Sequence, residues 1–243
     1  EVPVTDWQGN PYDPEAGPAA HPNSRFTVPM KQCPTYSDQA EAPKGVPISA
    51  IVFGGRRERL VPLVIESKSW QHGVLLGASM ASETTAAAAG AVGVVRRDPM
   101  AMKPFCGYNF ADYWSHWLTF TDRADNLPLI FHVNWFRKDN NGKFMWPGFG
   151  DNLRVLEWII KRCKGEAGVN ETAIGGVPLP ADININGLDT DNATLEALLA
   201  VDSEAWSTEL EQIREYLEQY GDRLPAQLIA ELDSVTTALS ASA

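Results

Sequence analysis

Apolar residues recur along the chain in two spacings, and together they predict a mixed α/β fold. Short apolar, β-branched runs bounded by turn residues are typical of buried strands, and the first 165 residues contain several of them. Between and after these runs, apolar positions recur every three to four residues, as on one face of a helix. We expect strands at 46–53, 60–66, 91–95 and 128–134, and helices at 108–120, 152–164, 191–200, 203–220 and 225–241.

The same pattern divides the chain into three segments. Residues 1–45 hold many prolines and little periodicity, so we expect a connecting irregular segment. Residues 46–165 alternate strand and helix patterns, which predicts a mixed α/β core. Residues 166–243 look loop-like as far as Gly187 and helical after it, which predicts a C-terminal helical appendage packed on the core.

Polar and glycine residues mark several predicted helix ends. Asp151 is placed to cap the helix at 152–164, and Gly165 is placed to close it. Asp202 or Ser203 can cap the helix that follows at 203–220.

Charge and cysteine usage narrow the class of protein. A formal net charge of −11 disfavours a nucleic-acid partner, because such proteins present a basic face to the phosphates. No apolar stretch reaches the length of a membrane span, so we expect no membrane partner. The three cysteines, Cys33, Cys106 and Cys163, are widely spaced and fit reduced thiols. We therefore expect a cytoplasmic protein.

The start of the chain has the composition of a connecting loop. The first residue is Glu1, and glycines, prolines and aspartates crowd the residues that follow it. We expect that the chain derives from a longer polypeptide.

The segment 131–152 carries the densest candidate chemistry. Its large rings are interrupted by the turn signals Asn140-Asn141-Gly142 and Pro147-Gly148. Rings held by turns can sandwich a base, and Asn152 could supply an amide to the base edge. A hairpin that packs its own rings as a small core explains the pattern equally well. The rings are Phe131, Trp135, Phe136, Phe144, Trp146 and Phe149.

Three further segments could carry chemistry. Gly54-Gly55-Arg56-Arg57 follows a predicted strand and could bring arginines to a phosphate, or could form a solvated turn. His21 to Arg25 has the composition of a surface loop. Ser82 to Gly93 has small side chains, which suit either a short Ala-rich helix capped by Ser82 or a mobile lid.

Common catalytic motifs are missing from the sequence. There is no GxxxxGK[ST] phosphate cradle, and no Ser-His-Asp or Cys-His arrangement is visible. The four histidines, His21, His72, His116 and His132, are scattered, and each is interpreted as a structural residue. The sequence predicts no metal site in this chain.

Taken together, these segments resemble GTP-dependent phosphoenolpyruvate carboxykinase. Order and spacing agree from residue 20 to about residue 165, and more weakly beyond. The long aromatic motif is typical of the GTP-dependent carboxykinases, and the ATP-dependent carboxykinases lack it. The matching motifs are AHPNSRF (20–26), QCP (32–34), GVPI (45–48), IVFGGRR (51–57), PLV (62–64), SWQHGV (69–74), SETTAAA (82–88), DPMAMKPFCGYNF (98–110), FHVNWFRKDNNGKFMWPGFGDN (131–152) and RVLEW (154–158).

The resemblance implies a fold and a reaction. It implies the mixed-sheet, nucleotide-binding C-terminal domain of that family. Residues 1–45 would then include a substrate-side loop, and residues 46–165 would form the nucleotide-binding core with the lid and the guanine pocket. Oxaloacetate would lose carbon dioxide, and the resulting enolate would take the γ-phosphate of GTP, giving phosphoenolpyruvate and GDP. Two divalent cations, Mn²⁺ and Mg²⁺, would assist. Their Lys, His and Asp ligands and the phosphate-binding loop are expected in an N-terminal part of the same enzyme, upstream of Glu1.

The resemblance also implies roles for individual residues. Arg56 would contact the γ-phosphate, Arg25 would bridge substrate and phosphate, and Asn23 would lie near the substrate carboxylate. The lid would span Ser82 to about Gly93. Its later half reads Ala88-Ala89-Gly90-Ala91-Val92, where many relatives carry an acidic residue, a His and a Lys. The guanine would be surrounded by Phe136, Phe144 and Phe149, with Trp135 beside them and Asn152 on its edge. The lid would include Ser82, Glu83, Thr84, Thr85 and Gly90.

Two other interpretations stay open at this point. The chain could be a guanine-nucleotide-binding module without catalysis, or an inert proteolytic fragment. If the chain is instead the C-terminal part of a carboxykinase, catalysis needs the N-terminal part, and the isolated chain is expected to be inactive.

Overall fold

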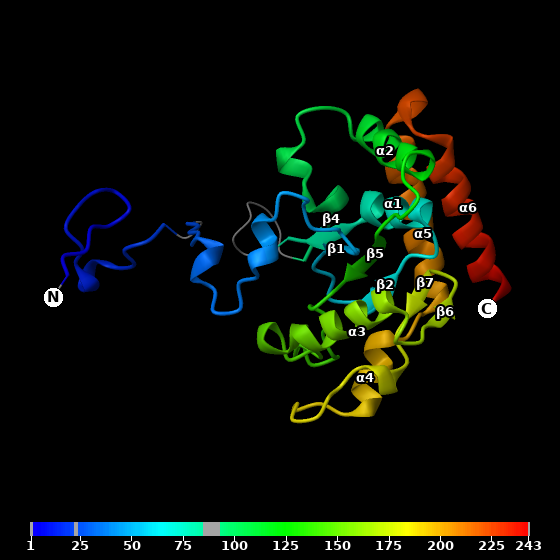
Figure 1. Cartoon of the computed structure of the whole chain (residues 1–243). Helices are drawn as coiled ribbons and strands as arrows, with labels where there is room; N and C mark the ends of the chain where they lie inside the picture. The colour runs from blue at the N-terminus through cyan, green and yellow to red at the C-terminus, as the bar shows by residue number, and fades with distance from the viewer. Residues whose placement is uncertain (1, 22–23, 85–92, 243) are drawn as a thin grey trace. The chain divides into compact units, whose positions relative to one another are not determined.

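Residues 2–21, 24–84 and 93–242 are described by a computed structural model (Figure 1). The chain forms two compact units, Glu1–Pro47 and Ile48–Ala243. Described residues of the first unit form three short 3-10 helices, and none of them is buried. These helices are η1 (Pro14–Ala16), η2 (Met30–Gln32) and η3 (Asp38–Glu41).

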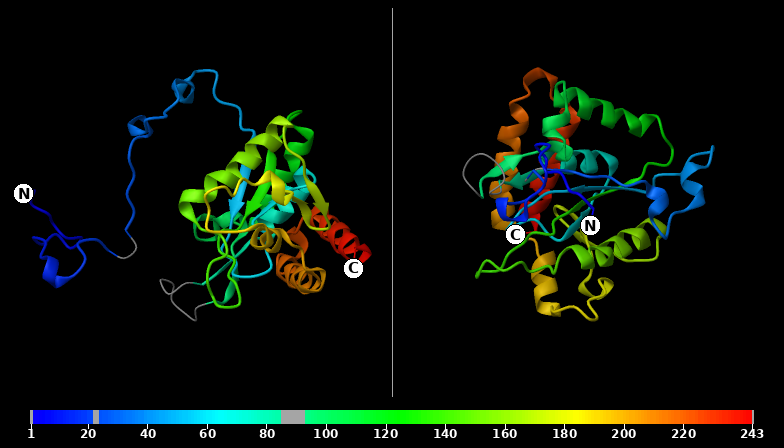
Figure 2. Two further views of the ribbon diagram at one scale, coloured as in Figure 1. Left: turned by 90° about the horizontal axis from the view of Figure 1, so that it is seen from below. Right: turned by 90° about the vertical axis from the view of Figure 1, so that its left-hand side faces the viewer.

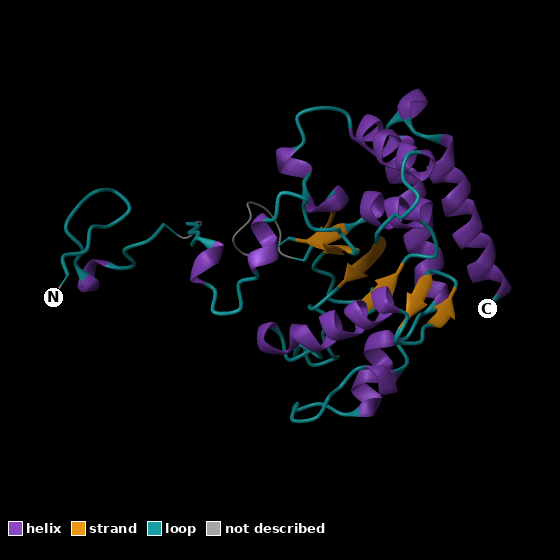
Figure 3. Cartoon of the chain, viewed as in Figure 1, coloured by secondary structure: helices purple, strands orange, loops and turns teal. Residues whose placement is uncertain are grey.

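The second unit is built on a five-stranded mixed sheet with the order β1-β5-β2-β7-β6 (Figure 3). Strands β1 and β5 run parallel, whereas the other neighbouring pairs are antiparallel. This confirms the mixed α/β class predicted from the sequence. The strands are β1 (Ala50–Gly54), β2 (Val64–Glu66), β5 (Leu129–Val133), β6 (Asn170–Thr172) and β7 (Gly175–Val177).

Helices cover both faces of the sheet (Figures 1 and 2). Alternate residues of β5 separate the two cores, since Ile130 packs in one hydrophobic cluster and Phe131 in the other. Apolar side chains of α1, α2, α5 and α6 belong to the cluster of Ile130, and those of α3 and α4 to the cluster of Phe131. The helices are α1 (Trp70–Ser79), α2 (Phe110–Leu118), α3 (Asn152–Lys164), α4 (Asn192–Leu199), α5 (Ser203–Glu218) and α6 (Ala226–Ala241).

The predicted helices are present within two residues at each end. Asp202 caps α5 by accepting the backbone N–H of Ala205, and Gly165 ends α3 in a left-handed conformation. Asp151 does not cap α3 with its side chain, because its carboxylate accepts from Arg154 Nε at 3.2 Å instead. No helix in the described part of the chain has the length and apolar character to cross a membrane.

The strand predictions were less accurate. Strand β1 begins at Ala50 rather than at 46, and β2 begins at Val64 rather than at Leu60, whose φ is positive at 71°. Of the strand expected at 91–95, residues 91–92 lie outside the described part. A hairpin of β3 (Ala81–Glu83) and β4 (Val95–Arg97) includes only the last residue of that prediction.

The stretch before Gly187, interpreted as loop-like, contains two strands of the main sheet. Strand β7 pairs with β2 through Glu66 and Gly176, and β6 forms the sheet edge. Gly175 has a φ of 128°, and a Cβ there would lie 2.6 Å from the Glu66 carbonyl oxygen. Because glycines permit this close approach, the hairpin lacks the β-branched run that marks a buried strand.

Candidate functional site

The turn of Gly54 to Arg57 and the aromatic segment begin at the same edge of the sheet. Strands β1 and β5 are parallel, with Gly54 beside Val133, so both chains leave the sheet side by side. In open α/β sheets, ligands bind outside the carboxyl ends of the strands. The fold therefore brings two of the predicted site segments together, although Arg57 and Asn134 lie 77 positions apart in the sequence.

Asn134 joins these two segments. Its side chain is fully buried, and Oδ1 accepts the backbone N–H of Arg57 at 3.1 Å and that of Phe136 at 3.3 Å. Nδ2 donates to the carbonyl oxygens of Arg57 at 2.9 Å and Val61 at 3.0 Å. Sequence analysis missed Asn134, although a polar residue directly after a buried strand was a usable signal.

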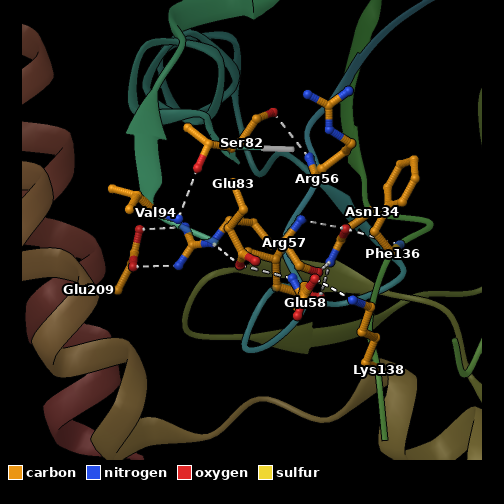
Figure 4. Close-up of polar contacts among 12 residues, drawn as sticks. Arg56, Arg57, Glu58, Ser82, Glu83, Val94, Asn134, Phe136, Lys138 and Glu209 are labelled. Carbon is orange, nitrogen blue, oxygen red and sulfur yellow. Dashed lines mark hydrogen bonds and ion pairs between the residues drawn. The ribbon is translucent and has the colours of Figure 1, made fainter. Parts of the chain in front are cut away.

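The two arginines of the turn have different environments (Figure 4). Arg57 is buried and donates from Nη1 and Nη2 to Glu209, both at 2.9 Å. Arg56 is exposed, and its guanidinium points away from the Arg57–Glu209 pair. The prediction of a phosphate contact at Arg56 fits its exposure, whereas the solvated-turn alternative is wrong for Arg57.

The start of the predicted lid packs directly on this turn. The backbone N–H of Arg56 donates to Ser82 Oγ at 3.1 Å, and the N–H of Glu83 donates to the Arg56 carbonyl at 2.8 Å. A Cβ on Gly55 would lie 2.4 Å from the Ala81 carbonyl oxygen, so only glycine permits this packing. Thr84 is described and its backbone pairs with Val94, whereas Thr85 and Gly90 lie outside the described residues.

The aromatic segment divides into core rings and accessible rings. Phe131 and Trp146 are fully buried in the cluster under α3, so these two rings cannot contact a ligand. Phe144 is 51% exposed and Phe149 is 97% exposed, while Trp135 and Phe136 are half-buried. The alternative in which the hairpin packs all of its rings as a small core therefore does not hold for Phe144 and Phe149, which are exposed.

A tight hairpin between Lys138 and Phe144 carries one of the accessible rings. The Asp139 carboxylate accepts the N–H groups of Asn141 at 2.8 Å and Lys143 at 2.9 Å, and Gly142 has a φ of 80°. Phe136 meets Phe144 edge to face at 6.2 Å between ring centroids, and Lys138 Nζ lies 5.2 Å from the Phe144 centroid.

Lys138 also ties this hairpin back to the arginine turn. Its ammonium forms an ion pair with Glu58, and its backbone N–H donates to the Glu58 carbonyl at 2.9 Å. The turn and the hairpin are thus held together by a charged contact as well as by Asn134 (Figure 4).

Asn152 lies at the start of α3, after the accessible Phe149. Its Oδ1 accepts from Trp146 Nε1 at 2.9 Å, so a buried ring orients the amide. An amide oxygen has a second lone pair and the amide nitrogen has two hydrogens, which leaves bonding capacity for a base edge. Its guanine contact stays a prediction.

Arg25 and Asn23 belong to the other compact unit. Arg25 is described and exposed, and its Nη1 donates to the Ser24 carbonyl at 3.1 Å. Asn23 lies outside the described residues. Their placement beside Arg56 therefore stays a prediction from the resemblance.

The buried histidines fit structural roles. Burial lowers the pKa of His72 to about 4, with a smaller effect from the charge of Lys68. Burial likewise lowers the pKa of His132 to about 4, with Arg57 adding to the shift. Among the described residues, no group of three His, Cys, Asp or Glu side chains could hold a metal ion.

Comparison with known proteins identifies one family. A family model described as the phosphoenolpyruvate carboxykinase C-terminal P-loop domain matches residues 1–238. Phosphoenolpyruvate carboxykinase [GTP] of Chlamydia muridarum is 51% identical over 97% of this chain and 40% of its own length. The enzyme of the same name from Neocallimastix frontalis is 51% identical over 100% of this chain and 41% of its own length.

A third relative gives the same result. Phosphoenolpyruvate carboxykinase [GTP] of Paenarthrobacter aurescens is 50% identical, over 97% of this chain and 39% of its own length. The chain thus spans about two fifths of the length of the curated relatives it matches.

Proposed function

The chain belongs to the family of GTP-dependent phosphoenolpyruvate carboxykinases, and from this premise we propose that it is the nucleotide-binding C-terminal part of such an enzyme. The complete enzyme would convert oxaloacetate and GTP to phosphoenolpyruvate, GDP and carbon dioxide, in gluconeogenesis or anaplerosis. One observation supports this most strongly: Asn134 holds the exposed-arginine turn and the aromatic hairpin together at one sheet edge.

The exposed side chains of this edge suit the two ends of GTP. Phe136, Phe144 and Phe149, with Trp135 beside them, would enclose the guanine, and Asn152 would bind its edge. Stacking contributes about 1–3 kcal/mol per base without selecting the base, so selectivity would come from the amide. Arg56 would contact the γ-phosphate, because a permanently charged guanidinium matches phosphate oxygens.

In the reaction, the C–C bond to the leaving carboxylate breaks and its electrons form the enolate of pyruvate. The enolate oxygen attacks the γ-phosphorus, and the bond from that phosphorus to the bridging oxygen of GDP breaks. Arg56 and Arg25 would offset negative charge on the transferred group and the substrate. Asn23 would position the substrate carboxylate.

The metals of the proposed reaction need ligands from elsewhere. The described residues include no group of three His, Cys, Asp or Glu side chains that could hold a metal ion. We propose that Mn²⁺ and Mg²⁺ are bound by the remaining, N-terminal part of the enzyme, which would also be this chain's partner. Bound there, they would neutralise charge on the nucleotide and substrate.

The segment beginning at Ser82, Glu83 and Thr84 would be the lid, with Thr85 and Gly90 in its outer part. The first residues of this segment, in β3, contact both the backbone N–H and the carbonyl of Arg56. A closed lid would keep water from protonating the enolate.

We propose a cytoplasmic location for the enzyme.

An assay of the complete enzyme tests this function. We expect phosphoenolpyruvate from oxaloacetate with GTP and far less with ATP, and an Arg56→Ala variant should lose most of the turnover. GTP binding without any conversion would favour the alternative of a guanine-nucleotide-binding module. Conversion that is equal with ATP would contradict the proposed guanine site.

A further inference from the structure

Glu209 is a buried carboxylate that bridges two arginines from distant parts of the chain. It lies on α5, and its side chain is 7% exposed. Oε1 accepts from Arg57 Nη1 at 2.9 Å and from Arg97 Nη1 at 2.7 Å, and Oε2 accepts from Arg57 Nη2 at 2.9 Å. Three charged groups are therefore enclosed in one contact.

The two arginines belong to the two segments that pack against each other at the site. Arg57 ends the glycine–arginine turn after β1, whereas Arg97 ends β4 and pairs in register with Ala81 of β3. Arg97 also donates to the Ser79 carbonyl at 3.0 Å, which fixes the base of the hairpin to the end of α1. Glu209 of α5 therefore contacts both the glycine–arginine turn, through Arg57, and the β3–β4 hairpin, through Arg97.

Arg56 lies at the junction of these segments. Its backbone N–H donates to Ser82 Oγ and its carbonyl accepts from Glu83, both in β3. Its exposed side chain takes no part in the Glu209 contact and points away from it (Figure 4). If the glycine–arginine turn moved relative to the β3–β4 hairpin, the backbone of Arg56 would therefore move and its guanidinium would point in a different direction.

Charge balance explains why this position needs a carboxylate. Burial raises the pKa of Glu209, but hydrogen bonds and charges of Arg57 and Arg97 outweigh that effect and lower the pKa overall. A second carboxylate, Glu83, lies 3.8 Å from Arg57 Nε. The buried guanidinium of Arg57 and the partly buried one of Arg97 thus face two carboxylates, and a neutral residue at 209 would leave the arginines undercompensated.

We propose that Glu209 is a positioning residue: by holding Arg57 and Arg97 together, it fixes the direction in which Arg56 meets the terminal phosphate of a nucleoside triphosphate. This inference rests on the proposed function of Arg56. It assigns α5, outside every predicted site segment, a part in recognising the triphosphate. Glu209 itself does not contact the nucleotide.

A double-mutant cycle on the complete enzyme tests the proposal. Dissociation constants for GTP and GDP are measured for the Glu209→Gln, Arg56→Ala and doubly substituted variants. Because Arg56 would contact only the third phosphate, Glu209→Gln should weaken GTP about tenfold and GDP less than twofold. In the Arg56→Ala background, Glu209→Gln should have no further effect on GTP.

Two further variants keep the test decisive. Glu211→Gln makes the same chemical change at an exposed position of α5, and it should leave both dissociation constants unchanged. Arg97→Lys keeps the charge but changes the hydrogen-bond geometry, so it should give the same selective loss in smaller measure. Its thermal unfolding and that of Glu209→Gln show whether each variant folds, and Arg97→Lys carries the test if Glu209→Gln does not fold.

The outcomes separate this inference from the proposed function. If Arg56→Ala selectively weakens GTP while Glu209→Gln and Arg97→Lys do not, only the positioning role is overturned. The positioning role is also overturned if Glu209→Gln weakens GTP binding equally in the parent and in the Arg56→Ala variant. It is overturned as well if Glu209→Gln weakens the binding of GTP and GDP equally. If Arg56→Ala leaves GTP binding unchanged, the phosphate role of Arg56 fails and the inference fails with it.

Discussion

The carboxamide of Asn134 accepts the backbone N–H of Arg57 at 3.1 Å and donates to the carbonyl of the same residue at 2.9 Å. This pair of hydrogen bonds resembles the pairing between two strands, although one partner is a side chain. It continues the contact between β1 and β5 beyond the end of the sheet. The proposed nucleotide site depends on this connection, because the phosphate-side turn and the base-side hairpin meet there.

Replacing Asn134 with Ala should therefore affect both stability and GTP binding. The change leaves the buried N–H of Arg57 without its acceptor, which costs about 1–3 kcal/mol. Denaturant unfolding measures this cost, and the dissociation constant for GTP should rise as well. Asn141→Ala, in the exposed hairpin turn, is the matched control and should change neither by a comparable amount. Equal effects at both positions would contradict the linking role of Asn134.

Replacing Phe149 with Ala should weaken nucleotide binding without destabilising the fold. The ring is 97% exposed, so its removal costs almost no buried area. Loss of one stacking contact of about 1–3 kcal/mol predicts a 5- to 150-fold weaker GTP affinity. Phe105→Ala removes another exposed ring, 83% exposed and outside the aromatic segment, and should have no such effect. If both variants bind GTP like the parent, Phe149 does not contact the base.

Replacing Gly55 with Ala should separate the arginine turn from the β3 strand. The new Cβ would lie 2.4 Å from the Ala81 carbonyl oxygen, so one backbone segment must move. Such overpacking costs about 1–3 kcal/mol and would lengthen the contact between Arg56 N–H and Ser82 Oγ. Gly107→Ala, where the structure shows nothing within 4 Å of the new Cβ, serves as the control. Unfolding free energies that agree for the two variants would show that the close approach is not required.

Stability should fall as the solution is acidified from pH 6.5 to about pH 4. His72 and His132 are held neutral by burial, with pKa values near 4 against 6.5 in the unfolded chain. The unfolded state therefore binds protons first in this window, and each histidine removes about 3 kcal/mol of stability across it.

Unfolding free energies of a His132→Gln variant check this pH dependence. Because the variant cannot titrate at that position, its loss of stability between pH 6.5 and pH 4 should be about 3 kcal/mol smaller than that of the parent. His116→Gln makes the same substitution at an exposed position and serves as the control. A slope that is unchanged in His132→Gln would contradict the neutral, buried state of His132.

The parts of the fold that sequence analysis found are those with local signals. Strand β5 has an apolar run, α3 has a helical stripe and a closing glycine, and the turn at Asn140–Gly142 has the expected residue types. The hairpin of β6 and β7 was missed because its glycines matter through their approach to β2, which the local sequence does not show.

The site was predictable in its segments but not in its connections. The resemblance placed Arg56 and the aromatic hairpin in one site, and the parallel pairing of β1 and β5 explains why they meet. The burial of Arg57 depends on Glu209, which lies 152 residues away and was not among the predicted residues. Of the six rings in segment 131–152, Phe131 and Trp146 are core residues, and spacing could not separate them from the accessible ones.

Tryptophan fluorescence of the 243-residue chain, titrated with GDP, GTP and ADP, tests the central claim most directly. Trp135 is half-buried beside the proposed guanine site, so a base held there should change its emission. We expect a saturable response to GDP and GTP that exceeds the response to ADP and is lost in a Trp135→Phe variant. Equal responses to GDP and ADP, or no response to any nucleotide, would contradict a guanine site formed by this chain.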